Sequence, residues 1–309
     1  MPSYLVTGGA GFIGSHLAAA LIARGDRVWV LDDLSTGKRE NLPQGAELMV
    51  GDVADAATVG RAMQGADGCF HLAAIASVQR CNEDWAGSHR VNQTGSVNVF
   101  EAVRERHRPV VYASSAAVYG DNPDLPLIET AATRPLSAYG ADKLGSELHG
   151  RVASHVHGVP TTGCRFFNVF GPRQDPASPY SGVIAIFANR IANGQDITFF
   201  GDGGQERDFI YVADVVRHLL AAMDRLRSGE KGGDVFNVCT GRSTTVRQLA
   251  ETIAGLIGWR LDARLAPPRA GDIRRSLGNP GRAVELLGVR AETGLAEGLK
   301  TTLDWMRSG

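Results

Sequence analysis

The sequence has no marked excess of charge, no long apolar run and few cysteines. Its 309 residues include 32 Lys and Arg against 33 Asp and Glu, so the formal net charge is -1. This balance gives no net positive electrostatic potential that would attract nucleic acid or an anionic bilayer, and we expect neither partner. No apolar run approaches the ~20 residues of a membrane-spanning helix. With 43% hydrophobic residues, the profile is that of a globular protein acting on a small molecule.

Cysteine is scarce, and the four residues lie far apart in the sequence. They form neither a CxxC pair nor the spacing of a secreted disulfide framework, so we expect reduced thiols in a cytoplasmic protein. For the same reason no metal site is expected. The first residues also lack the basic segment of a signal peptide, so we expect a protein that is neither exported nor inserted into a membrane. The four cysteines are Cys69, Cys81, Cys164 and Cys239.

The first half of the chain alternates short β-rich runs with segments of helical spacing. The runs are apolar throughout, which is typical of strands covered on both faces. Right-handed crossovers between such strands build a parallel doubly wound sheet, so we predict an α/β fold. The predicted strands are 4–6, 28–31, 47–50, 69–72 and 110–113.

From about residue 171 the sequence changes to Gly- and Pro-rich turns, which predict a second, smaller lobe. A predicted helix over 212–226 interrupts it, and a further sheet strand at 234–239 and a helix over 246–257 follow. We therefore expect two interleaved lobes that share one cleft. The predicted domains are a cofactor domain of residues 1–168 plus about 205–240, and a C-terminal substrate-binding lobe of about 169–204 plus 241–309.

A glycine-rich segment, Thr7 to Gly14, directly follows the first predicted strand and opens an amphipathic helix. Gly8 permits the tight turn, Gly11 lets the backbone approach a pyrophosphate, and Gly14 allows close packing of the helix on the strand. The free N–H groups and the dipole at the helix N-terminus favour a negative charge there. This context favours a dinucleotide site over the alternative, a tight βα turn without a ligand.

Acidic residues end the second predicted strand, about twenty residues beyond the glycines. Asp32 can accept hydrogen bonds from an adenosine ribose, and its charge repels a 2′-phosphate, which favours NAD over NADP. Lys38 and Arg39 in the next loop work against that preference, and an ordinary strand-end cap is the alternative role for the carboxylate. Asp52, after the third predicted strand, is expected to meet the adenine.

Tyr139 and Lys143 stand four residues apart, which places a phenol and an ammonium on one face of a helix. To act as a base near pH 7 the phenol must lower its pKa by about 3 units, or about 4 kcal/mol. One cation about 5 Å away supplies about 3 kcal/mol at an effective dielectric constant near 20. Lys143 together with a positive nicotinamide ring would suffice, and Lys143 alone would not. The alternative is an ordinary exposed helix pair.

Two hydroxyls, Ser114 and Ser115, end the fifth predicted strand. Ligands of open α/β sheets bind at that edge, so Ser115 can share a proton with Tyr139. The alternative is a pair of serines that only satisfy the turn.

Together these motifs resemble an extended short-chain dehydrogenase/reductase over nearly the whole chain, which implies a Rossmann fold. More narrowly, the sequence is similar to nucleotide-sugar epimerases of the UDP-glucose 4-epimerase type. Cys81 and Trp85 depart from the residues common in that family, so the role of their loop stays open. The segments that carry the narrower resemblance are 34–37, 41–42, 71–74, 92–95, 165–172, 207–209 and 269–272.

The resemblance implies NAD as the cofactor, a UDP-sugar as the substrate, and Ser115, Tyr139 and Lys143 as the catalytic residues. The implied cofactor set is Gly8, Gly11, Phe12, Ile13, Gly14, Asp32, Asp33, Asp52, Val53, Leu72, Ala73, Ala74, Tyr139 and Lys143. The implied substrate set is Ser115, Asn168, Phe200, Arg207, Arg269, Asp272 and Ser276. Within it, Asn168, Arg207 and Arg269 would contact the diphosphate-sugar part. Asp272 would meet the uridine ribose, and Phe200 would lie beside the uracil.

Ser276 stands where the resemblance places the residue beside the sugar's C2 substituent. Family members confined to plain hexoses carry a bulky Tyr there, and a small Ser leaves room for an N-acetyl group. We therefore expect UDP-GlcNAc and UDP-GalNAc to be accepted beside UDP-Glc and UDP-Gal.

Ala116 and Ala117 occupy positions where related dehydratases carry an Asp-Glu pair and decarboxylases a Glu, which favours epimerisation. A UDP-uronic acid epimerase stays open. A non-catalytic dinucleotide sensor is the alternative of another class. The resemblance also suggests a homodimer through helices near 89–106 and 140–157, although packing on the sheet explains their apolar spacing as well.

Overall fold

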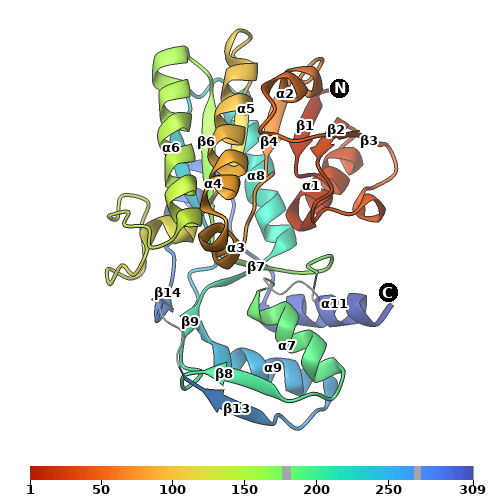
Figure 1. The fold of residues 1–309 in the computed structure, drawn as a ribbon, viewed down its shortest axis with the longest axis vertical. Helices are drawn as coiled ribbons and strands as arrows, with labels where there is room; N and C mark the ends of the chain where they lie inside the picture. The colour runs from red at the N-terminus through yellow and green to blue at the C-terminus, as the bar shows by residue number, and fades with distance from the viewer. Residues whose placement is uncertain (176–181, 268–272, 309) are drawn as a thin grey trace.

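The computed structural model describes residues 1–175, 182–267 and 273–308. Within them, a seven-stranded parallel sheet occupies the upper part of Figure 1, with the strand order β11-β6-β5-β4-β1-β2-β3. This confirms the predicted doubly wound α/β fold. The strands are β1 (Ser3–Thr7), β2 (Arg27–Asp32), β3 (Ala46–Val50), β4 (Gly68–His71), β5 (Val110–Ser115), β6 (Thr161–Phe166) and β11 (Asp234–Val238).

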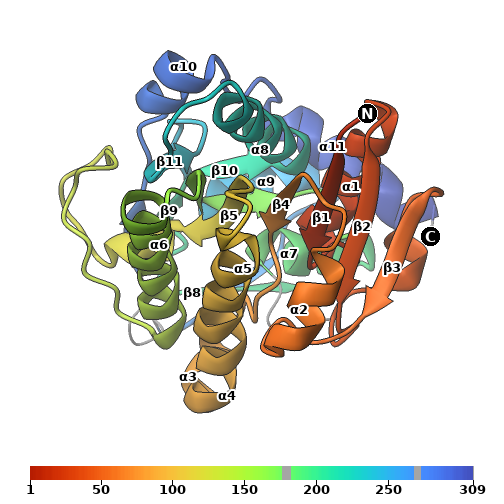
Figure 2. The same ribbon diagram turned by 90° about the horizontal axis from the view of Figure 1, so that it is seen from above.

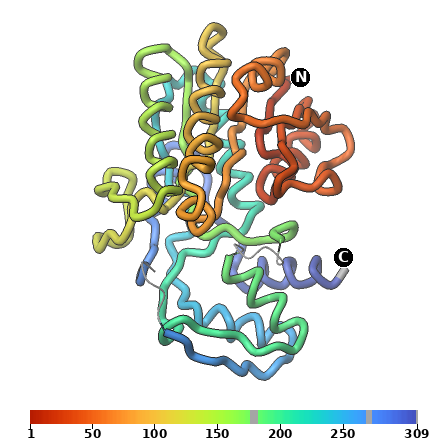
Figure 3. The backbone as a smooth tube through the Cα atoms, viewed as in Figure 1, coloured from red at the N-terminus to blue at the C-terminus, as the bar shows by residue number. Residues whose placement is uncertain are grey.

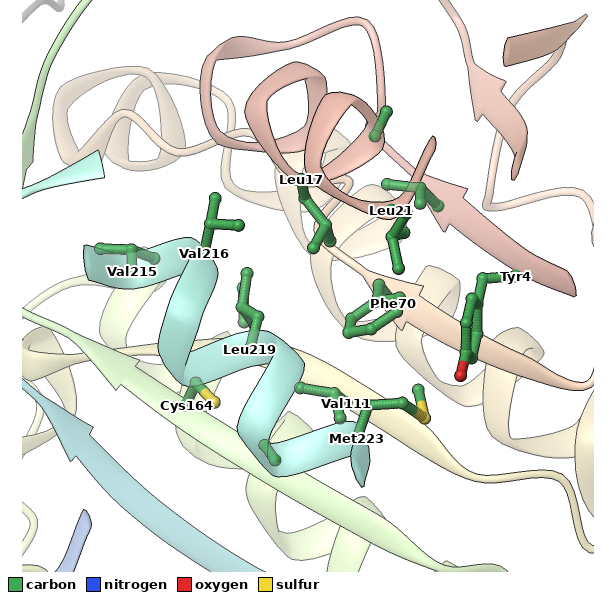
Figure 4. Packing of buried hydrophobic residues seen from close by; sticks show 14 of the residues in the cluster. Tyr4, Leu17, Leu21, Phe70, Val111, Cys164, Val215, Val216, Leu219 and Met223 are labelled. Carbon is green, nitrogen blue, oxygen red and sulfur yellow. The ribbon is translucent and has the colours of Figure 1, made fainter. Parts of the chain in front are cut away.

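Helices pack on both faces of this sheet, as Figure 2 shows from above. One face is covered by α1 (Phe12–Ala23) and α8 (Val212–Arg227), whose side chains gather around Phe70 of β4 (Figure 4). The other is covered by α2 (Ala56–Ala62), α5 (Gly95–Arg104) and α6 (Ala138–His157). Alternate residues of each inner strand enter the two cores, which explains their continuous apolar runs.

The edge strand β3 does not follow that rule. Its Met49 and Val50 are exposed, so the expectation of a strand covered on both faces was wrong for this segment. Hydropathy alone does not distinguish an inner strand from an edge strand.

The second lobe lies below the sheet in Figure 1 and has its own apolar core. Its strands β8 (Ile197–Phe200) and β13 (Ala263–Ala266) pair in parallel. Its helices are α7 (Val183–Ala192), α9 (Val246–Ile257) and α11 (Leu295–Ser308). The backbone enters this lobe after β6, returns through β10 (Phe209–Tyr211) into α8, and leaves the sheet again after β11, so the lobes interleave (Figure 3).

Short strands join the two parts. β9 (Glu206–Arg207) lies between β12 (Thr244–Thr245) and β14 (Arg275–Ser276), and β7 (Asn168–Phe170) pairs with β10 (Phe209–Tyr211). The remaining elements are η1 (Arg39–Asn41), α3 (Val78–Glu83), α4 (Trp85–His89), a π-helical turn (Arg90–Thr94), η3 (Ala116–Tyr119) and α10 (Gly281–Leu287). Among the helices of the described ranges, none combines the length and the apolar character that crossing a bilayer requires.

Candidate active site

The glycine-rich loop between β1 and α1 is packed too tightly for side chains. Gly8 has φ +70°, and a Cβ there would lie 2.7 Å from the backbone nitrogen of Ala73. A Cβ on Gly14 would collide with the carbonyl oxygen of Gly8. Gly11 is the N-cap of α1 and makes no side-chain cap bond. The loop therefore presents bare backbone and the N-terminus of a helix, which is the arrangement that holds a pyrophosphate.

Asp32 ends β2 beside this loop and is almost completely buried. Its carboxylate accepts hydrogen bonds from the backbone nitrogens of Ala10 and Leu34, both at 2.9 Å. Burial raises the pKa of Asp32, and these two donors partly offset the rise. A Cβ on Gly37 would lie 2.7 Å from Oδ1 of the carboxylate, so the neighbouring loop also closes on it. The carboxylate thus organises the loop as a cap while it faces the cavity.

One cavity along the carboxyl ends of the strands brings together every residue of the predicted cofactor set. The structure adds two cations at its wall, Arg80 and Arg90, which the sequence did not single out as cofactor contacts. Arg90 donates from Nη2 to Oδ2 of Asp52 at 2.5 Å. The only sequence signal for Arg90 was its place two residues before the motif at 92–95.

The three predicted catalytic residues converge where α6 begins beside the end of β5. Ser137 caps α6 by accepting a hydrogen bond from the backbone nitrogen of Gly140, and Tyr139 follows in the first turn. Ser115 is hydrogen bonded to the Tyr139 side chain, and it also accepts from the backbone of the next turn. Ser115 therefore contacts the phenol and also satisfies the turn.

Lys143 lies one turn beyond Tyr139 and is 3% exposed. Its Nζ donates to the carbonyl oxygen of Ala113 at 2.9 Å and lies 5.8 Å from the centroid of the Tyr139 ring. Burial lowers the pKa of Lys143 to about 8, and Asp142 partly offsets this. Burial raises the pKa of Tyr139 to about 12, and the bond with Ser115 opposes that rise. At pH 7 the ammonium is charged and the phenol is protonated, so the phenol needs further positive charge before it can act as a base.

A second cavity lies in the smaller lobe, where Asn168, Phe200 and Arg207 of the predicted substrate set meet. The sequence did not identify Phe187 and Arg190 of α7, which also line it. Ser276 is paired in register with Arg207 across β14 and β9. Arg269 and Asp272, the other predicted substrate contacts, lie outside the described residues.

A family model described as "NAD dependent epimerase/dehydratase family" matches residues 4–239. The chain belongs to the NAD-dependent epimerase/dehydratase family. It is 39% identical to a UDP-glucose 4-epimerase of Mycolicibacterium smegmatis, over 98% of each chain. The solved UDP-glucose 4-epimerase of Thermotoga maritima, with UDP-glucose, has 38% identity and a TM-score of 0.94 over 99% of each chain. A UDP-N-acetylglucosamine 4-epimerase of Methanobrevibacter ruminantium, in complex with UDP-N-acetylmuramic acid, has 34% identity and a TM-score of 0.94, over 99% of this chain and 98% of that one.

The cofactor of this epimerase/dehydratase family is NAD, and the first cavity fits it. The loop at Gly8 and Gly14 has no room for side chains, which leaves its backbone to face a pyrophosphate. The buried carboxylate of Asp32 stands at the strand end where an adenosine ribose is recognised, with no basic partner in its hydrogen bonds. The donor set therefore suits a dinucleotide without a 2′-phosphate.

A buried chain of hydrogen bonds supports the floor of the NAD cavity in this family member. Nδ1 of His71 lies 2.7 Å from the hydroxyl of Thr7, and its Nε2 lies 3.1 Å from the hydroxyl of Ser96. The Ser96 hydroxyl lies 2.9 Å from that of Ser146 on α6. Burial, together with the charge of Lys143, lowers the pKa of His71 to about 3. The imidazole is therefore neutral at physiological pH and acts as a structural bridge.

Proposed function

We propose that this enzyme interconverts UDP-hexoses that differ at C4, with NAD as a cofactor that stays bound. The observation that carries the proposal is the presence of two sites, one in each lobe. Tyr139, Ser115 and Lys143 converge beside the NAD cavity, while Arg207 and Asn168 line a cavity in the other lobe. The identity with named 4-epimerases over nearly the whole chain supports the same function.

The cofactor domain is assigned to residues 1–168 and about 205–240, and the substrate-binding lobe to about 169–204 and 241–309. Asn168 and Arg207 belong to the first of these ranges and contribute to the substrate cavity. In this assignment the cofactor set predicted from the sequence contacts NAD, and the cavity that contains the whole set supports it. When bound, NAD would supply the redox chemistry, as the acceptor and donor of the hydride at C4 of the sugar.

Tyr139 removes the proton of the C4 hydroxyl, and Ser115 bridges the sugar oxygen and the phenol. The ammonium of Lys143 and the positive charge of the oxidised cofactor favour the ionised phenol. Once the C4–H hydride has left, C4 becomes a ketone. Ala116 and Ala117 supply no carboxylate that could act as an acid or base in a further elimination, so these positions favour reduction of the ketone.

The other lobe holds the nucleotide end of the substrate. Arg207 binds the diphosphate, and Asn168 contacts the same region, while Phe200 lies beside the uracil. The resemblance adds Arg269 and Asp272 to this set. Because only the nucleotide end is held, the sugar ring can rotate in the site. The hydride then returns to the opposite face of C4.

Ser276 is the wall beside the C2 substituent. Its pairing with Arg207 supports this assignment, since the two residues lie side by side across β14 and β9. A small side chain there admits the N-acetyl sugars as well as the plain hexoses.

The function is tested by incubating the purified protein with UDP-hexoses and recording NMR spectra without added cofactor. We expect UDP-Gal and UDP-Glc to interconvert. Tyr139→Phe should lower the turnover rate by orders of magnitude and still bind the substrate. Turnover of UDP-glucuronic acid alone would favour the uronic acid epimerase. Retained NAD with no turnover of any UDP-sugar would favour the dinucleotide sensor.

We further propose a cytoplasmic homodimer that pairs through α5 and α6. Support for the dimer comes from exposed apolar residues on these helices, namely Val97, Leu148, Val152 and Val156. Support for the compartment comes from the four cysteines, which are all free and buried. Light scattering of the purified protein tests the dimer, and Val152→Glu is expected to shift it to monomer.

A further inference from the structure

A buried ion pair lies between α6 and the sheet, two helical turns beyond Tyr139. Glu147 follows Tyr139 and Lys143 at intervals of four residues, so the three side chains share one face of the helix. Arg165 of β6 donates from Nε to Oε1 of Glu147 at 2.8 Å and from Nη2 to Oε2 at 2.7 Å. The two side chains are only 4% and 6% exposed. Apolar residues would stabilise such a position as well or better, so stability alone does not account for the pair.

The same carboxylate holds the strand that carries Ser115. Ser114 donates from its hydroxyl to Oε1 of Glu147 at 2.5 Å. Lys143 donates to the carbonyl oxygen of Ala113, one residue earlier in β5. The helix is thereby bonded to two consecutive residues of β5 immediately before Ser115. Any shift of Glu147 changes the place of Ser115 relative to the phenol at the start of the helix.

The guanidinium extends the network toward β11, the edge strand that pairs with β6. Arg165 donates from Nη1 to the hydroxyl of Tyr119 at 2.8 Å and to the carbonyl oxygen of Glu129 at 3.0 Å. Tyr119 donates in turn to Oδ1 of Asn237 at 2.7 Å. Nδ2 of Asn237 donates to the carbonyl oxygen of Leu127 at 2.8 Å.

Leu127 connects this network to the segment that follows Ser276. Its backbone nitrogen donates to the carbonyl oxygen of Leu277 at 2.8 Å, and its own carbonyl accepts from the backbone nitrogen of Asn279 at 2.8 Å. Ser276 is paired in register with Arg207. One continuous set of hydrogen bonds thus joins the helix of Tyr139 to the segment that directly follows Ser276.

We propose that Glu147 and Arg165 are positioning residues, which fix Tyr139 and Ser115 at the geometry that the proton transfer requires. The inference rests on the proposed function, since the reaction concerned is the 4-epimerisation. Neither side chain lines the NAD cavity or the cavity of the smaller lobe. Their effect therefore passes through α6 and β5.

The test is the double variant Glu147→Leu with Arg165→Met, which replaces the pair by apolar side chains of similar size and so preserves the packing. We expect a folded protein in which kcat falls about 30-fold or more while KM for the UDP-sugar changes less than about threefold. The single variant Glu147→Gln keeps an acceptor for Ser114 and Arg165, and we expect it to retain at least about tenfold more activity than the double variant.

Thr161→Val is the matched control. The Thr161 hydroxyl donates to the carbonyl oxygen of Gly150 at 2.8 Å. The substitution therefore removes a buried bond between α6 and the first residue of β6, and it leaves Glu147 and Arg165 unchanged. We expect its kcat to stay within about threefold of wild type. A double variant with wild-type kcat, or an equal loss of kcat in Thr161→Val, would overturn the positioning role. If the double variant does not fold, Ser114→Ala decides by the same criterion of reduced kcat at unchanged KM, since it removes the bond from β5 to Glu147 and leaves the ion pair intact.

NAD binding separates this inference from the proposed function, because it needs no turnover. Tyr139 and Lys143 line the NAD cavity, so a displaced α6 should weaken NAD binding by calorimetry in the double variant and not in Thr161→Val. A wild-type protein inactive on every UDP-sugar would refute the proposed function, while the NAD measurement would still decide whether the pair places α6. Unchanged NAD affinity in the double variant would contradict the inference.

Discussion

The charge of Lys143 makes the sharpest prediction, because its effect on Tyr139 has a calculable size. Nζ lies 5.8 Å from the centroid of the Tyr139 ring. At an effective dielectric constant near 20, a unit charge at that distance favours the phenolate by about 3 kcal/mol, which equals about two pKa units. Lys143→Met removes the charge and keeps most of the side-chain length. We therefore expect kcat at pH 7 to fall about 100-fold.

The sign of the pH effect follows from the role of Tyr139 as a base. The rate rises with pH as the phenol ionises, and loss of a nearby cation raises the pKa of the phenol. In Lys143→Met the acid limb of the kcat profile should therefore move up by about two pH units, so that higher pH restores part of the rate. The assay is quenched turnover of UDP-Gal at saturating NAD, with Lys300→Met as a control at an exposed lysine. A lower profile with an unmoved acid limb would show that Lys143 only holds the cofactor.

Three further predictions concern substrate range, cofactor retention and acid stability. Ser276→Tyr should sharply lower kcat/KM for UDP-GlcNAc and UDP-GalNAc and spare UDP-Glc and UDP-Gal, whereas an equal loss for both pairs would show that Ser276 is not the gate. NAD should be released when the purified protein is denatured, and its absence there would point to an exchanging reductase. His71, with a pKa of about 3 when folded and about 6.5 when unfolded, takes up a proton only on unfolding between these values. The free energy of unfolding should therefore fall by up to ~4 kcal/mol as pH falls from 6.5 to 3. Chemical denaturation of His71→Gln should show a smaller decrease in the free energy of unfolding over that pH range. If the pH dependence is the same as in wild type, protonation of His71 is not its cause.

The sheet was predictable because its information is local. The apolar runs, the glycines after β1 and the helical spacing between strands each appear within a few residues. The predicted helix at 246–257 agrees with α9. The two-residue strands β9, β12 and β14 were not predictable, because their pairing joins segments tens of residues apart and leaves no periodic pattern.

The site divides in the same way. Contiguous motifs identified the glycines, Asp32 and the Tyr139-Lys143 pair, and the structure brings these together in one cavity. The position of Arg90 on Asp52 depends on tertiary contact, and a charged residue near a helix end carries no sign of its partner. The bidentate ion pair between Glu147 and Arg165 likewise has no pattern in the sequence that indicates it. Burial also set the electrostatics, since it raises the pKa of the Tyr139 phenol to about 12.

The central claim is that one hydride leaves C4 and returns to the opposite face of the same sugar. It is tested most directly by incubating the purified protein with UDP-galactose deuterated at C4, without added cofactor, and following the product by NMR. We predict UDP-glucose that still carries deuterium at C4. Product that has exchanged this deuterium for solvent hydrogen, or no product at all without added NAD, would contradict the account.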